Sequence, residues 1–246
     1  MLKVNLKSLL LLITIFSFVK SETVYSQYDS TALMIVRKMS SFISDLNSCS
    51  YKLETQYDVF NYDIGLVKHS EVSEVWMKGS NKFFVKKRGD KGEKDIYYDG
   101  WNLTSYSYNK NQYATAPAPA TTMETIEEFS KKYGIEFPAA DVFYPDLAGD
   151  IMNSSRKLYY LGITEIEGTQ CFHIAWKTDK MIIQLWIEKD KFYLPAKMSI
   201  VYSDEQGSPQ YEAVFKDWVV NPVLPDGMFD FSVPPSAVKI RFSPSK

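Results

Sequence analysis

The sequence predicts a mainly β protein of the α+β class, in which one antiparallel sheet of about eleven strands curls and carries helices on one face. Residues 49–59 alternate strictly between polar side chains and apolar, aromatic or β-branched ones, which is typical of a strand with one buried and one solvated face. Further segments of strand character occur on both sides of a helical stretch near the middle of the chain. A sheet of that width curls or closes, because open twisted sheets of this size rarely stay flat.

An amphipathic helix is expected from Asp29 to about Asn47. Asp29 and Ser30 form a capping pair, and the apolar residues after them recur at helical spacing. The period then changes to two in the strand 49–59. Five more strands, separated by turns rich in Gly, Asn and Asp, complete the first half of the sheet at about residues 66–77, 81–88, 94–98, 101–108 and 112–116.

The middle of the chain interrupts the strands. Residues 116–120 read Ala-Pro-Ala-Pro-Ala, which cannot pair as a central strand. Residues 122–133 predict a short helix with acidic residues early and basic residues late, and Gly134 supplies a left-handed end. A second, poorer helix is expected over 139–152, interrupted by Pro145.

The strands resume at about Leu158. Four or five of them are expected up to Val220, and an extended tail over 229–235 stops at its prolines. No linker rich in Pro, Gly or Ser divides the chain, so residues 28–246 are predicted to form one domain.

Composition excludes two classes of protein. The hydrophobic content of 45% is too high for an intrinsically disordered chain. The 28 Lys and Arg residues are outnumbered by 30 Asp and Glu residues, whereas a nucleic-acid-binding protein needs clustered cations to neutralise phosphates. We therefore expect a folded domain with no nucleic-acid partner.

Residues 1–21 predict a secretory signal peptide. Two lysines and no acidic residue precede an apolar run over 9–19. The small-residue rule fits cleavage after Ser21, or as late as Ser26. The run is shorter than the roughly 20 apolar residues that span a bilayer, so we expect a secreted protein whose membrane contact is only transient.

The two cysteines then lie in an oxidising compartment, where a disulfide is permitted. A domain of this size has a core large enough to fold without one. Two possibilities remain open: a bond between Cys49 and Cys171, or two buried free thiols.

Motifs for catalysis are missing from the sequence. It contains no Gly-x-Ser-x-Gly, no phosphate-binding Gly-x-x-x-x-Gly-Lys, no His-Glu-x-x-His and no Cys-x-x-Cys. Cys171 and His173 are two apart in a strand, where they could form a thiolate–imidazole couple or a partial metal site, or simply pack as strand residues. A hydrolase that uses His173 or a carboxylate pair is the less favoured interpretation, and we expect no enzyme, cofactor or metal.

Aromatic residues are abundant, with 17 Tyr, 15 Phe and 5 Trp. Most such rings fill a core, but a curled sheet this wide also encloses space that short helices do not fill. Rings in the strands would then line an apolar pocket suited to an acyl chain. The predicted lining residues are Trp76, Phe84, Trp101, Tyr106, Tyr108, Tyr113, Trp186 and Phe215.

An ordered set of motifs covers nearly the whole chain after residue 28. It includes Tyr-Tyr-Asp-Gly-Trp at 97–101, Gln-Tyr-Ala-Thr-Ala-Pro-Ala-Pro at 112–119, Gly-Thr-Gln-Cys-Phe-His at 168–173 and Phe-Asp-Phe-Ser-Val-Pro-Pro at 229–235. These motifs resemble a bacterial family of predicted periplasmic proteins of unknown function, which is itself similar to the lipoprotein-localisation carriers. The resemblance implies a periplasmic protein whose sheet forms an unclosed barrel, capped by helices around an apolar cavity, and it implies no catalytic residue.

We therefore interpret the chain as a periplasmic binding or carrier protein that holds a lipid or lipoprotein acyl chain between the curled sheet and a helical lid. Helix 122–133 would be the gate, and burial of apolar surface would drive binding at about 25 cal/mol per Å². The alternative is a cell-envelope sensor or scaffold domain, in which the same fold binds another protein through an exposed apolar patch.

Overall fold

The computed structural model describes residues 28–135, 137, 139–155 and 157–245. The predicted signal peptide, residues 1–21 with cleavage as late as Ser26, lies outside these residues. None of the helices in the described ranges is long and apolar enough to cross a membrane.

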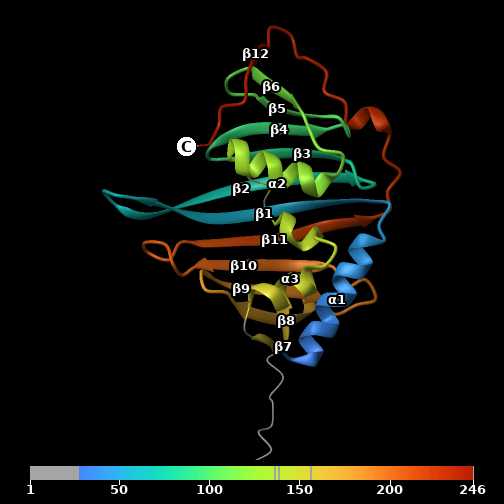
Figure 1. Cartoon of the computed structure of the whole chain (residues 1–246), viewed down its shortest axis with the longest axis vertical. Helices are drawn as coiled ribbons and strands as arrows, with labels where there is room; N and C mark the ends of the chain where they lie inside the picture. The colour runs from blue at the N-terminus through green and yellow to red at the C-terminus, as the bar shows by residue number, and fades with distance from the viewer. Residues whose placement is uncertain (1–27, 136, 138, 156, 246) are drawn as a thin grey trace, which may run out of the picture.

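Twelve strands build the described part of the chain. They are β1 Ser48–Asn61, β2 Gly65–Lys78, β3 Lys82–Gly89, β4 Gly92–Tyr98, β5 Asn102–Ser107, β6 Gln112–Pro117, β7 Leu158–Ile166, β8 Thr169–Lys177, β9 Met181–Glu188, β10 Pro195–Tyr202, β11 Gln210–Val220 and β12 Val238–Ile240. They form one sheet in the order β12-β6-β5-β4-β3-β2-β1-β11-β10-β9-β8-β7, so β12 and β7 are its two edges (Figure 1). The predicted class, mainly β with an unclosed, curled sheet, is confirmed.

The strand β1 joins the two halves of this sheet. It pairs antiparallel with β2 from Ser48 to Asn61 on one side and with β11 on the other. The chain runs from β1 through successive hairpins to β6, crosses to the far edge through the helical insertion, and returns from β7 to β11. The expected arrangement, six strands, a helical insertion and five more strands, is therefore observed, with β12 added.

The helices begin and end where their capping residues predict. Asp29 caps α1 (Ser30–Ser44) by accepting hydrogen bonds from the backbone N–H groups of Thr31 and Ala32. Thr121 caps α2 (Thr122–Tyr133) by accepting a hydrogen bond from the backbone N–H of Glu124, while its hydroxyl donates to the Glu124 carboxylate. Gly134 ends the helix with a φ of 62°. The poorer helix is split around Pro145 into the 3₁₀ helix η1 (Ala140–Phe143) and the helix α3 (Leu147–Ser154).

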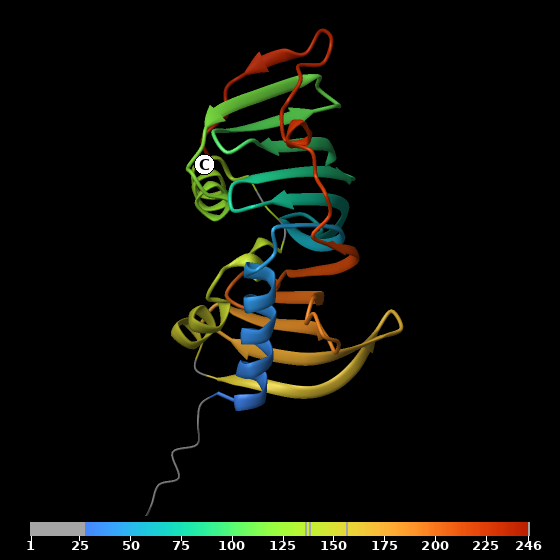
Figure 2. The same ribbon diagram turned by 90° about the vertical axis from the view of Figure 1, so that its right-hand side faces the viewer.

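All three α-helices lie on the same face of the sheet, which we call the inner face (Figures 1 and 2). α1 and α3 contact each other over the half that ends in β7, whereas α2 covers the other half. Buried side chains of helices and strands form a single core here, including Ile35, Met39, Leu53, Val75, Phe83, Phe129, Ile151, Ile174 and Leu185.

Residues 221–245, here called the C-terminal strap, cross to the edge of the sheet. The strap contains the 3₁₀ helix η2 (Asp226–Met228) and an extended stretch, and then pairs as β12 in parallel with β6. The sequence did not predict β12, because three exposed residues carry no recognisable period. Beyond β12 the strap returns to α2, where the ring of Phe242 lies 5.5 Å from that of Phe129. There the Ser245 hydroxyl donates a hydrogen bond to the carbonyl of Lys131 at 3.1 Å.

Both cysteines are free and buried, which decides between the two possibilities left open by the sequence. Cys49 is in β1 and Cys171 in β8, with three strands between them. Four strand spacings amount to about 19 Å, whereas a disulfide needs Cα atoms within about 7 Å. Burial raises the pKa of the Cys49 thiol to about 12 and that of Cys171 to about 11, so neither thiolate is populated near neutral pH.

We expect neither thiol to react with Ellman's reagent at pH 8 in the folded protein, because the thiolate is the reactive species. After unfolding in guanidinium chloride both should react at once, giving two thiols for each chain. A thiol that reacts rapidly in the folded protein would contradict the burial described here.

Candidate functional site

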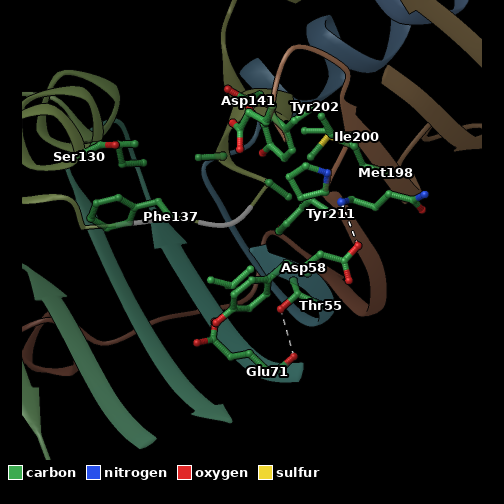
Figure 3. Close-up of a pocket in the computed structure, with 18 of the residues that line it drawn as sticks. Thr55, Asp58, Glu71, Ser130, Phe137, Asp141, Met198, Ile200, Tyr202 and Tyr211 are labelled. Atoms are coloured by element: carbon green, nitrogen blue, oxygen red, sulfur yellow. Dashed lines mark hydrogen bonds between the residues drawn. The ribbon is translucent and has the colours of Figure 1, made fainter. Parts of the chain in front are cut away.

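A cleft of about 820 Å³ opens on the inner face where the two halves of the sheet meet. Strands β1, β2, β10 and β11 form its floor, and α2, Phe137 and residues 139–144 form its roof. Figure 3 shows Ser130 and Phe137 on one side of this central cleft, and Met198, Ile200 and Tyr202 on the other. The remaining described lining residues are Thr55, Tyr57, Asp58, Val59, Glu71, Lys91, Ile126, Glu127, Lys131, Ala139, Ala140, Asp141, Tyr144, Glu205, Pro209, Gln210 and Tyr211.

Polar contacts tie the strands of the floor together. The Thr55 hydroxyl donates to the carbonyl of Glu71 at 3.2 Å. Asp58 accepts a hydrogen bond from the backbone N–H of Gln210 at 3.0 Å and pairs with Lys68 at 2.9 Å. The hydrogen bond from Lys68 is the main cause that lowers the pKa of Asp58, so this carboxylate is charged and already partnered. These polar groups join the strands of the floor, and they line the cleft together with apolar side chains such as Val59, Met198 and Ile200.

The roof carries two of the acidic groups of the cleft, Glu127 and Asp141, whereas Asp58, Glu71 and Glu205 line other parts of it. Asp141 is exposed at the mouth, yet the protein that surrounds its carboxyl raises its pKa above the usual value of an aspartate. Tyr144 lies beside Glu127 of α2, and burial, then its hydrogen bond with Glu127, raises the pKa of the phenol. The mouth is therefore polar, in contrast to the deeper wall formed by Met198 and Ile200.

A second, apolar space of about 40 Å³ lies deeper under α2. Ile126, Phe137 and Ala140 line both this space and the central cleft. The Phe137 ring packs edge-on against Phe83, with ring centroids 5.5 Å apart. Phe137 therefore stands between the cleft and an apolar interior that includes Leu53, Val75, Phe83, Val85 and Ile96.

Five of the predicted lining residues lie on the opposite, outer face of the sheet. Trp76 stacks on Phe84 at 5.3 Å, and Phe84 stacks on Tyr97 at 4.4 Å. Phe231 of the C-terminal strap covers this group, with its ring 5.4 Å from that of Tyr97. The centroid of the Phe231 ring also lies within 6.0 Å of the ring centroids of Tyr106 and Tyr113, two of the five predicted residues. The fifth, Tyr108, packs edge-on against Tyr106 and donates a hydrogen bond to Asp95.

The other three predicted residues are scattered. Trp101 is 79% exposed in the turn between β4 and β5. Trp186 lies on the outer face between the ring of His173 and the ammonium group of Lys197, and Phe215 packs in the inner core against Tyr51. None of the eight is among the described residues that line the central cleft or the apolar space.

The sequence did contain a signal for part of the lining of the central cleft. Thr55, Tyr57 and Val59 belong to the apolar side of the alternating segment 49–59, and all three reach the cleft. Met198 and Ile200 share the same parity in β10. Sequence reasoning passed over these residues because it selected rings rather than one face of each strand.

The geometry does not join Cys171 and His173 into a reactive couple. The His173 imidazole is hydrogen-bonded to the side-chain amide of Gln184 at 3.0 Å and stacks on Trp186, and burial lowers its pKa. The Cys171 thiol donates to the carbonyl of Thr169 at 3.5 Å. Within the described residues, no three His, Cys, Asp or Glu side chains are placed to hold a metal ion. The expectation of a non-enzymatic protein stays a prediction.

A single unclosed sheet, helices over its inner face and a cleft between them define the fold. The chain belongs to the family described as "Predicted periplasmic protein (DUF2092)", which matches residues 32–243. This family is the one that the ordered motifs indicated, and its description agrees with the predicted periplasmic localisation.

Several solved structures align with most of this chain. An uncharacterized conserved protein from Thermus thermophilus is 12% identical, with 86% of this chain and 99% of that chain covered and a TM-score of 0.51. The Mycobacterium tuberculosis lipoprotein LppX is 15% identical, with 80% and 98% covered and a TM-score of 0.47. A LolA superfamily protein from Nitrosomonas europaea is 10% identical, with 81% and 97% covered and a TM-score of 0.38. No curated protein sequence matches the chain.

Replacing Phe231 tests whether the strap is bound to the outer face through its ring. We expect Phe231→Ala to lower the free energy of unfolding by about 2 kcal/mol, because it removes a half-buried ring from three tyrosines. Val233→Ala, at a position 56% exposed in the same segment, should change it by less than about 0.5 kcal/mol. Equal effects in chemical denaturation would show that the ring contacts do not hold the strap.

Proposed function

We propose that the protein binds a lipid or lipoprotein acyl chain in the central cleft. The observation that carries this proposal is that Ile126, Phe137 and Ala140 line both the cleft and the apolar space beneath α2. The cleft volume of about 820 Å³ is within the usual range of small-molecule sites. An acyl chain that enters past Met198 and Ile200 buries apolar surface, which contributes a favourable free energy of about 25 cal/mol per Å². Binding of this kind needs no reactive group.

In this proposal α2, Phe137 and residues 139–144 act as the lid. The side chains of Ile126 and Phe137 separate the mouth from the deep space, which is too narrow for a chain while Phe137 occupies its present position. Displacement of Phe137 from its contact with Phe83 would extend the cleft beneath α2. The gate predicted at helix 122–133 corresponds in this proposal to α2 together with Phe137 and residues 139–144.

Protein purified from its native periplasm should carry a hydrophobic ligand. Native mass spectrometry is expected to record a mass above that of the mature chain, and organic extraction should release a molecule with an acyl chain. Delipidated protein should then bind a fluorescent acyl probe with saturation. The absence of extractable lipid, together with no saturable binding of the probe, would overturn the proposal.

Variants at the junction of the two spaces give a sharper test. Ile126→Asp places a carboxylate where an acyl chain must pass, and Ser130→Trp fills the mouth from α2, so we expect each to weaken probe binding by about tenfold or more. Ile64→Asp makes the same substitution at a residue 75% exposed in the turn between β1 and β2, and should bind normally. Thermal unfolding of all three separates lost binding from lost folding.

A second candidate function, an envelope scaffold or sensor, is favoured by one observation. The edge strand β7 exposes Tyr159, Leu161 and Ile163. An exposed apolar edge is a surface to which a partner's strand can add. In that case Leu161→Lys would abolish binding of a protein partner and leave the acyl probe bound.

A further inference from the structure

A recess of about 300 Å³, here called the basic groove, lies beside the C-terminal strap on the inner face. Four cationic residues line it, and they come from the β3–β4 turn, from β4, from the β5–β6 turn and from the strap: Lys91, Lys94, Lys110 and Arg241. The polar side chains of Ser105, Ser107, Asn109, Gln112 and Ser243 also line it, together with Glu93, Ala114, Ile240 and Phe242. The groove therefore offers positive charge and hydrogen-bond donors together.

The four cations of the basic groove form no ion pair with any acidic side chain of the described residues. Glu93 also lines the groove, but its carboxylate pairs with Arg88 at 3.3 Å. The neighbouring Asp90 is engaged by His69 at 3.2 Å and by the backbone N–H of Ser70 at 3.0 Å. A chain with a formal charge of −2 thus keeps a local excess of positive charge in this recess.

The basic groove adjoins the central cleft. Lys91 lines both recesses, and its ammonium group lies 4.7 Å above the ring of Tyr57, which is also in the cleft. Both recesses open on the inner face, where Ser105 and Ser107 share the parity of the buried Leu103 in β5. A ligand that occupies the cleft can therefore place its polar end among the cations.

We propose that the basic groove binds the phosphate of an anionic lipid headgroup while the acyl chains of the same lipid occupy the central cleft. This inference rests on the proposed function and narrows its ligand to an anionic amphiphile. Lys and Arg side chains recognise phosphate oxygens through charge-assisted hydrogen bonds, and serine hydroxyls and amide groups can add donors to the remaining oxygens. The groove supplies each of these groups.

Three soluble probes separate headgroup binding from acyl binding. They are short-chain phosphatidylglycerol below its micelle concentration, diacylglycerol with the same chains, and glycerol 1-phosphate. We expect phosphatidylglycerol to bind about tenfold more tightly than diacylglycerol, with an affinity that falls as salt is raised, because the cations of the groove are exposed. Glycerol 1-phosphate, which buries no apolar surface, should bind far more weakly than either lipid.

The double variant Lys94→Gln/Arg241→Gln should weaken phosphatidylglycerol binding about tenfold and leave diacylglycerol binding unchanged. Its matched control is Lys180→Gln/Lys189→Gln, which removes the same charge from two exposed turns in the other half of the sheet and should bind both lipids normally. Equal thermal unfolding midpoints establish that both variants are folded.

Each contrary result has a distinct meaning. Equal binding of both lipids, unaffected by the groove variant, would overturn the headgroup site and leave acyl binding intact. If glycerol 1-phosphate binds as tightly as the phospholipid, the lipid-headgroup site is overturned, and the groove binds a soluble phosphate compound instead. Failure of both lipids to bind would overturn the proposed function itself.

Discussion

A right-handed twist accumulates across the twelve strands, and the curled inner face that results is wider than helices of 15, 12 and 8 residues can cover. α1 and α3 pack together over one half, and α2 packs over the other. The uncovered interval falls at β1, β10 and β11, where Met198 and Ile200 reach the cleft. The central cleft is therefore a consequence of the mismatch between the width of the sheet and the size of its cover.

The outer face of the sheet is covered in part by the C-terminal strap. Its aromatic residues would be exposed to water without the strap, because no α-helix of the described chain lies on this side. Phe231 covers Tyr97 and its neighbours, Asp226 pairs with Lys78 and Lys82, and the strap then passes to β12. The same segment goes on to contact α2, so one stretch of chain connects the packing of the outer face to the roof of the cleft.

Local sequence was sufficient for most elements, since alternation predicts β1 and a left-handed Gly134 ends α2. It was not sufficient for the site. Phe83 and Phe84 are adjacent, so period two assigns one ring to each face, but no local feature tells which face the helices cover. Which face each ring belongs to depends on contacts with distant residues, such as Phe231, which covers the outer face. The opening of the cleft depends likewise on the position of α2 over the sheet.

The central position of β1 also dictates an order of assembly. Its partner β2 follows after a three-residue turn, whereas β11 pairs Val220 with Cys49 across most of the chain. Local hairpins close early, and contacts between distant segments are slow because a long loop must first be ordered. The meander β1–β6 can thus fold while the polypeptide is still emerging on the far side of the inner membrane, but the floor of the cleft exists only once β11 has docked. Any cargo of this cleft must consequently wait for the last long-range step in the maturation of the protein.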